Sequence, residues 1–160
     1  MEIWDLYDVN RNIIGEHIRG EELPANTYHL VVHVWIKNEY GQYLISQRSD
    51  TRPTFPLMWE CTGGSVLKGE NSLQGALRET KEEVGVDLSV ENGKLLFSKV
   101  RDKNNILDVW LFEYNGDISL ENATTDEVKQ VKWMSRDEIL KLKEENTFVP
   151  TLYYFFDKVD

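Results

Sequence analysis

The chain has 160 residues, of which 41% are hydrophobic and 29% charged, a composition typical of a globular protein with a buried core. Its formal net charge of −10 argues against a nucleic-acid backbone or an anionic membrane as a partner. One cysteine excludes an intrachain disulfide, and no signal peptide or membrane-spanning apolar run is present, so we expect one cytoplasmic domain over residues 1–160.

The first third of the chain predicts strands separated by turns. Residues 2–19 predict a β-hairpin, followed by a polar connection over residues 19–27. The almost continuous β-branched and aromatic run 28–36 predicts a buried central strand, and residues 42–48 are expected to be its hairpin partner. Two prolines in residues 49–57 predict a loop.

A helix with recognisable ends comes next. Asn71 is followed three residues later by Gln74, a pattern that predicts an N-cap and a helix that begins near Ser72. Gly85 suits the left-handed position just beyond a helix, so the same helix is expected to end there.

This helix places three carboxylates, Glu79, Glu82 and Glu83, on one face. They form either a solvated acidic face or the ligand set of a divalent cation, since hard cations prefer oxygen ligands. The small residues Gly75 and Ala76, one turn earlier, predict room for a ligand. A second stripe of the helix is expected to pack on a sheet: Leu73, Leu77, Thr80 and Val84.

The remaining chain predicts strands over residues 94–100, 106–114 and 128–134, and then a helix over residues 135–145 that starts with a capping box. Many strands with two or three helices favour an α/β class with a mixed sheet. The aromatic segment 148–156 is either a short helix packed on the core or a contact in a homodimer.

Residues 64–86 resemble the Nudix box, G-x5-E-x7-R-E-U-x-E-E-x-G-U, where U is a bulky apolar residue. A match of this quality at a given start has a chance probability of about one in a hundred million. One packing position departs from the pattern, with Thr80 in place of the first bulky apolar residue. The matching residues are Gly64, Glu70, Arg78, Glu79, Glu82, Glu83, Gly85 and Val86.

This resemblance implies a Nudix-type α/β/α sandwich with a mixed central sheet, here preceded by an N-terminal β-hairpin. The segments WDLYD, RGEELP and YHLVVHVWI are similar to one branch of the family, the proteins that resemble isopentenyl-diphosphate isomerase. For activity, the resemblance implies Mg²⁺-dependent hydrolysis of a pyrophosphate bond by a metal-activated water, with Mn²⁺ as an alternative cofactor. The implied substrate is a small nucleoside diphosphate-linked compound or a nucleoside di- or triphosphate.

The resemblance also implies roles for individual residues. Glu82 and Glu83 would be the main metal ligands, and Glu79 a third ligand or the group that orients and deprotonates the water. Gly64 would bring a backbone carbonyl close to the metal, and Arg78 would hold Glu79 in place.

Outside the box, three further side chains are candidates. A carboxylate on the loop before the late strand often completes such sites, and we favour Glu127 over Asp126. Arg48 and Arg52 lie on the loop expected to face the box and are candidates to bind the substrate's phosphates. A solvated turn and ordinary surface arginines are the alternatives for these positions.

Two other functions deserve comparison with hydrolysis. Isopentenyl-diphosphate isomerase uses a cysteine after a tryptophan, within a Cys-Gly-His-Pro type segment, together with metal-binding histidines. Here Cys61 stands too close to Trp59 and no His-Pro follows, although His29 occupies a position like one of the metal histidines. A non-catalytic diphosphate-binding module usually lacks some box carboxylates, all of which are kept here.

Overall fold

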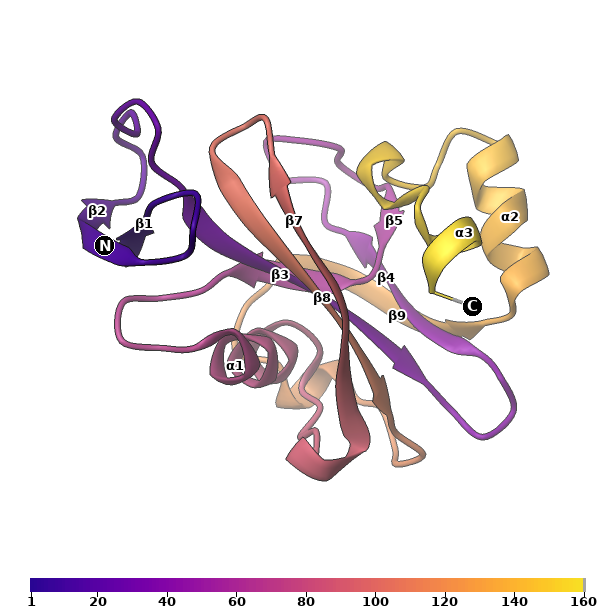
Figure 1. Cartoon of the computed structure of the whole chain (residues 1–160). Helices are drawn as coiled ribbons and strands as arrows, with labels where there is room; N and C mark the ends of the chain where they lie inside the picture. The colour runs from indigo at the N-terminus through magenta and orange to yellow at the C-terminus, as the bar shows by residue number, and fades with distance from the viewer. Residues whose placement is uncertain (160) are drawn as a thin grey trace.

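The computed structural model describes residues 1–159, in which a mixed β-sheet lies between α1 on one face and α2 and α3 on the other (Figure 1). This arrangement confirms the predicted α/β/α sandwich. None of the helices within residues 1–159 is long and apolar enough to cross a membrane. The helices are α1 Ser72–Val84, α2 Arg136–Glu144 and α3 Phe155–Lys158. The strands are β1 Ile3–Tyr7, β2 Ile13–Ile18, β3 His29–Lys37, β4 Tyr43–Arg48, β5 Trp59–Glu60, β6 Thr62–Ser65, β7 Gly93–Arg101, β8 Asn105–Glu113 and β9 Val128–Met134.

The main sheet has the strand order β5-β4-β3-β8-β7, with β6 paired to β3 and β9 paired to β4. β3 and β8 run parallel along their whole lengths, whereas the other pairs are antiparallel. As expected, β4 follows β3 through a tight turn and pairs with it antiparallel, but the pairing is limited to Lys37 and Tyr43 at the closed end of the hairpin. The reason is that β5 and β6 lie between the two strands, with β5 paired to β4 and β6 paired to residues 31–34 of β3, while β9 pairs with the other edge of β4.

Alternation along β3 divides its side chains between two cores, as expected for a central strand. Leu30, Val32, Val34 and Ile36 face the core beneath α1. Trp35 faces the opposite core, beneath α2 and α3. The central strand therefore fixes both layers of the sandwich at once.

The N-terminal hairpin β1–β2 forms a separate two-stranded sheet beside the main one. Tyr7 and Tyr28 exchange two backbone hydrogen bonds of 2.8 Å, which join β1 to the start of β3. Arg11 in the hairpin turn donates a 2.7 Å hydrogen bond to the buried carboxylate of Asp108 on β8. The hairpin is therefore held against the main sheet at two points.

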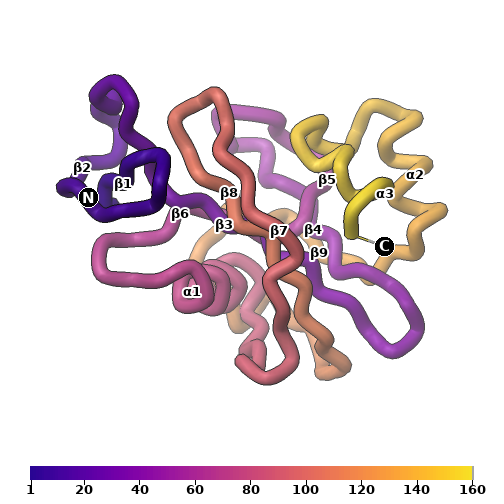
Figure 2. The backbone as a smooth tube through the Cα atoms, in the orientation of Figure 1, coloured from indigo at the N-terminus to yellow at the C-terminus, as the bar shows by residue number. Residues whose placement is uncertain are grey.

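The aromatic C-terminal segment folds back onto the sheet beside α2 (Figure 2). Phe148, Leu152 and Phe155 are buried in the core with Trp35. Of the two alternatives for this segment, packing on the core is the observed one, while a homodimer stays a prediction.

Candidate active site

The ends of α1 are set by the local contacts that its sequence predicts. The Asn71 side chain accepts a 2.8 Å hydrogen bond from the Gln74 backbone, and the Gln74 side chain accepts a 2.9 Å bond from the Asn71 backbone. At the other end, Gly85 adopts the left-handed conformation with φ of 71°. These fixed ends determine which residues of α1 turn toward the sheet and which toward the cleft.

The inner face of α1 is packed tightly against the sheet. Thr80 and Val84 are fully buried, and the Thr80 hydroxyl donates a 2.8 Å hydrogen bond to the Ala76 carbonyl, so the departure from the Nudix pattern leaves no polar group unpaired. The expectation of room for a ligand beside Gly75 and Ala76 was wrong. Ala76 is fully buried, and a β-carbon at Gly75 would come within 2.8 Å of the Val66 side chain, so small residues here allow close packing.

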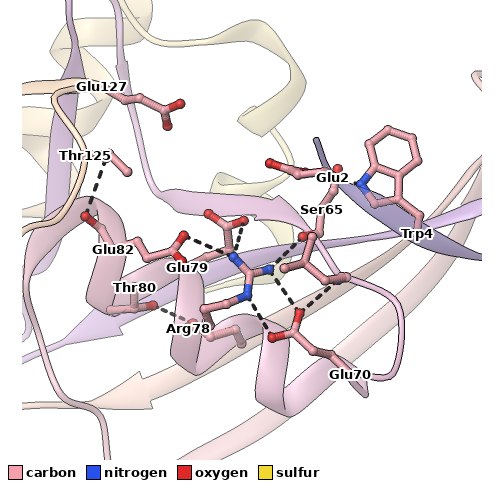
Figure 3. Close-up of polar contacts among 12 residues, drawn as sticks. Glu2, Trp4, Ser65, Glu70, Arg78, Glu79, Thr80, Glu82, Thr125 and Glu127 are labelled. Atoms are coloured by element: carbon pink, nitrogen blue, oxygen red, sulfur yellow. Dashed lines mark hydrogen bonds and ion pairs between the residues drawn. The ribbon is translucent and has the colours of Figure 1, made fainter. Parts of the chain in front are cut away.

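Arg78 lies at the centre of the carboxylates (Figure 3). Its Nε and Nη2 donate bonds of 2.8 and 3.0 Å to Glu70, and Nη1 donates bonds of 3.1 Å to both Glu79 and Glu82. Nη2 also donates to the Ser65 carbonyl at 3.0 Å. Burial disfavours the guanidinium charge, but the hydrogen bonds to Glu70 and the charge of Glu79 raise the pKa of Arg78 above its usual value. One guanidinium thus orients three carboxylates.

The carboxyl groups of Glu79 and Glu83 lie in a largely buried position. Glu83 is only 5% exposed, and burial together with the nearby charge of Glu79 raises its pKa well above the usual range. Burial likewise raises the pKa of Glu79. Two desolvated carboxylates side by side favour either a shared proton or a bound cation, because neither ionises easily alone.

Gly64 lies directly against Glu79. A β-carbon at this position would come within 2.5 and 2.6 Å of the two Glu79 oxygens. Carboxylate oxygens beside a backbone that approaches without a side chain suit Mg²⁺, a hard cation. Within residues 1–159 no three acidic or histidine side chains already converge as a closed metal site. Glu82 accepts from Arg78 and is 38% exposed, so it has the freedom to turn toward Glu79 and Glu83.

These carboxylates line a pocket of about 150 Å³. Glu79, Glu82 and Glu83 form one wall, and Glu127 and Arg52 contribute to the opposite one. The structure therefore brings together the box carboxylates and the favoured residue of the late loop, whereas Asp126 does not line this pocket.

The loop that carries Glu127 is attached to the end of α1. The Glu82 carbonyl accepts backbone hydrogen bonds from Thr124 at 2.9 Å and from Thr125 at 3.3 Å. The Glu127 carboxylate accepts a 3.2 Å bond from Arg52. These contacts hold the loop across the cleft from the box carboxylates, and Figure 3 shows Glu127 on the side opposite Arg78.

Arg48 and Arg52 differ in what they contact. Arg48 is buried, and it donates a 2.9 Å bond to the Thr54 carbonyl and another of 2.9 Å to Glu60. Burial raises the pKa of Glu60, an effect that the neighbouring charge of Arg48 opposes. Arg48 thus anchors the 49–57 loop, whereas Arg52 lines the acidic pocket. A phosphate-binding role for either arginine stays a prediction.

Sequence reasoning did not identify two residues of the pocket wall. Glu2 directly precedes β1, and Arg19 directly follows β2. Both residues line the same pocket, and their side chains form a 2.9 Å ion pair. No local signal marks them, because they precede the box by more than forty residues and reach it only through the fold.

The large aromatic side chains that could stack on a nucleobase belong mainly to the cores. Trp35 and Trp59 are buried beneath α2 and α3, and Tyr28 and Trp110 pack against the core on the α1 side. Cys61 is buried among them, as expected of a small apolar side chain.

Comparison with known proteins places this geometry in a family. Residues 27–155 match the NUDIX domain. An uncharacterized Nudix hydrolase of Listeria innocua is 37% identical over 161 residues, covering 99% of this chain and 94% of its own length. Isopentenyl-diphosphate Delta-isomerase I of Camptotheca acuminata is 29% identical, with 86% of this chain and 68% of that protein covered. The crystal structure of DR0079 from Deinococcus radiodurans shares the fold, with a TM-score of 0.74, 22% identity and 92% of both chains covered.

Proposed function

Since the chain belongs to the NUDIX domain family as an enzyme of the pyrophosphohydrolase class, we propose that it uses Mg²⁺ to hydrolyse a pyrophosphate bond. The proposed substrate is a nucleoside diphosphate-linked compound or a nucleoside di- or triphosphate. One observation carries the proposal: Glu79 and Glu83 are desolvated side by side in a cleft, next to a glycine that leaves their oxygens accessible. We further propose that residues 1–160 act as one domain.

Mg²⁺ would be held by Glu79, Glu82, Glu83 and the backbone carbonyl of Gly64, with Mn²⁺ suited to the same oxygen ligands. When bound, such an ion neutralises charge on the diphosphate oxygens and lowers the pKa of water. Where Glu79 does not bind the ion, it is the proposed acceptor of the water's proton, because Arg78 fixes its orientation by a 3.1 Å hydrogen bond.

Residues on the opposite wall have proposed roles in binding. Glu127 lies in the same pocket as the box carboxylates and is positioned by Arg52 and by the loop's attachment to α1. Arg52 is the proposed contact to a substrate phosphate, because its guanidinium lines the cleft. Arg48 is the weaker candidate, because Thr54 and Glu60 already occupy its donors.

The substitution Glu82→Gln tests this function. Glu82 is 38% exposed and its contact in the cleft is one 3.1 Å bond from Arg78, so the fold should tolerate the change. We expect Mg²⁺-dependent turnover on the best compound of a nucleotide and nucleotide-sugar panel to fall by about 100-fold or more. Glu144→Gln, the same change at an exposed position of α2, serves as the control. Wild-type rates in Glu82→Gln would refute the ligand assignment.

Isomerisation of isopentenyl diphosphate is the second candidate, because a named isomerase aligns with 86% of this chain. The state of Cys61 argues against a thiol-dependent reaction. The residue is 3% exposed, and burial raises its pKa well above the usual range, so the reactive thiolate is disfavoured. We expect no isomerisation of isopentenyl diphosphate by either the wild type or Cys61→Ala.

A further inference from the structure

Three pockets follow one another from the box carboxylates to the turn between β7 and β8. The acidic pocket shares Gly63, Gly64 and Glu83 with a second pocket of about 270 Å³. The second shares His33 and Thr151 with a third of about 440 Å³. Because each neighbouring pair has lining residues in common, the third pocket adjoins the second and the second adjoins the acidic pocket.

The charge of the lining changes sign along this path. The first pocket has five glutamates against two arginines, whereas the third has Lys99, Arg101 and Lys103 against one carboxylate, Asp102. Within residues 1–159, no hydrogen bond or ion pair joins the ammonium group of Lys99 or Lys103 to another group. Free cations gathered in one pocket of a chain with a net charge of −10 point to an anionic ligand.

Strand register places Lys99 and Arg101 on the same side of the sheet as His33. Lys99 pairs with Leu107 and Arg101 with Asn105, and residues paired across strands share a face. Leu107 and Asn105 lie two and four residues before Val109, on the same face of β8, and Val109 pairs with His33. The path from β6 to β7 crosses three strand spacings, which is about 14 Å.

His33, at the junction of the second and third pockets, is held in one protonation state. The Trp35 indole can only donate, and it donates a 3.0 Å bond to the Tyr154 hydroxyl. That hydroxyl's own proton is therefore available for the 2.8 Å bond to Nδ1 of His33, which leaves the imidazole proton on Nε2. Burial lowers the pKa of His33 to about 3, so the ring is neutral at pH 7.

We propose that Lys99, Arg101 and Lys103 form a second anion subsite that binds a phosphate monoester on the part of the substrate beyond the cleaved diphosphate. His33 supplies a neutral N–H donor to the uncharged portion in between. This inference rests on the proposed function and narrows its substrate class to diphosphates whose further group carries an additional phosphate. The span of about 14 Å separates the backbones of β6 and β7, and the flexible side chains of Lys99 and Lys103 allow a phosphate on the sugar next to the diphosphate to be reached.

Matched substrate pairs test the subsite by kinetics. NADPH differs from NADH, and coenzyme A from its 3′-dephospho form, by one phosphate monoester on a ribose. We expect the wild type to favour the phosphate-bearing member of at least one pair by about tenfold in kcat/KM. In the double variant Lys99→Gln/Lys103→Gln, the ratio of the two kcat/KM values should fall toward one. The kcat/KM for the member without the phosphate should stay within about twofold of the wild-type value.

The control variant removes the same charge elsewhere. Lys94→Gln/Lys129→Gln changes two exposed lysines on β7 and β9 that lie outside the third pocket, and it should keep the wild-type preference. The inference is overturned if the wild type hydrolyses these compounds without preference, or if the Lys99/Lys103 variant keeps the preference unchanged.

A binding measurement separates failure of the subsite from failure of the proposed hydrolysis. Calorimetry with adenosine 2′,5′-bisphosphate and AMP needs no turnover, and we expect the bisphosphate to bind about tenfold more tightly to the wild type. The advantage should vanish in Lys99→Gln/Lys103→Gln and weaken with added salt. If no panel compound is hydrolysed, the proposed function fails. The subsite is then judged by calorimetry alone, and equal binding of the bisphosphate and AMP to the wild type would overturn it.

Discussion

The ion pair between Arg11 and Asp108 should determine how firmly the N-terminal hairpin is held. Arg11 donates bonds of 2.7 and 2.5 Å to the two Asp108 oxygens, and Ser98 donates a third of 2.6 Å. Removing one partner of a buried pair costs about 3–5 kcal/mol. Since the Arg11 side chain is 39% exposed and Ser98 remains, we expect Arg11→Met to cost about 2–3 kcal/mol. For a chain of this size, that lowers Tm by about 4–12 °C.

The pH dependence of this loss follows from the state of Asp108. Burial alone would raise its pKa, but hydrogen bonds from Arg11, Ser72 and Ser98 outweigh burial and hold the pKa below its usual value. Asp108 therefore stabilises the wild type above the unfolded-state pKa, and this contribution is lost as pH falls through the lower folded-state pKa. Without Arg11, burial dominates and the pKa rises, so the deficit of Arg11→Met should be largest at neutral pH and shrink in acid.

Urea unfolding at pH 7 and pH 5 measures both effects. Arg11 has a positive φ of 72°, which arginine and methionine disfavour alike, so the comparison reports on the lost ion pair and its hydrogen bonds and not on backbone strain. Adding Asp108→Asn to Arg11→Met should recover part of the loss, because it removes the unpaired buried charge. The reasoning is refuted if Arg11→Met unfolds at the wild-type urea concentration, or if its deficit is equal at both pH values.

Three further substitutions probe the box. Gly64→Ala should lower kcat at least about tenfold with little change in urea unfolding, because its β-carbon displaces only the flexible end of Glu79; full activity would contradict this. Glu70→Gln should lower kcat/KM by about tenfold, since Glu70 acts by orienting Arg78, and an unchanged rate would show that this contact is dispensable. Thr80→Val should change the unfolding free energy by less than about 1 kcal/mol, measured in urea, because its buried hydroxyl bonds only a carbonyl of its own helix; a loss above about 2 kcal/mol would assign it a larger role.

The parts of the fold that the sequence predicts well are those that depend on neighbouring residues. The capping residues Asn71 and Gln74 and the terminating Gly85 act within a few residues, so they give both ends of α1 correctly. Strand pairing depends on distant segments. The hairpin of β3 and β4 pairs only at its closed end because β5 and the short, glycine-containing β6 lie between the two strands, and nothing within residues 42–48 signals this.

The same contrast holds for the candidate site. Glu79, Glu82 and Glu83 are predictable together because one helical turn brings them to one side. The distant contributors, Glu2 and Lys99, approach the cleft only through the fold, and their local sequences resemble any exposed strand.

The two hydrogen bonds that the Glu82 carbonyl accepts from Thr124 and Thr125 make one wall of the cleft continuous with α1. The backbone of a proposed metal ligand thereby anchors the loop that holds Glu127 on the other side. Because these bonds limit how far the loop can move from the helix, we expect the width of the cleft to limit the size of the compounds that it accepts. Redirecting the enzyme toward a bulkier compound would then require re-engineering the 124–127 segment together with the end of the helix.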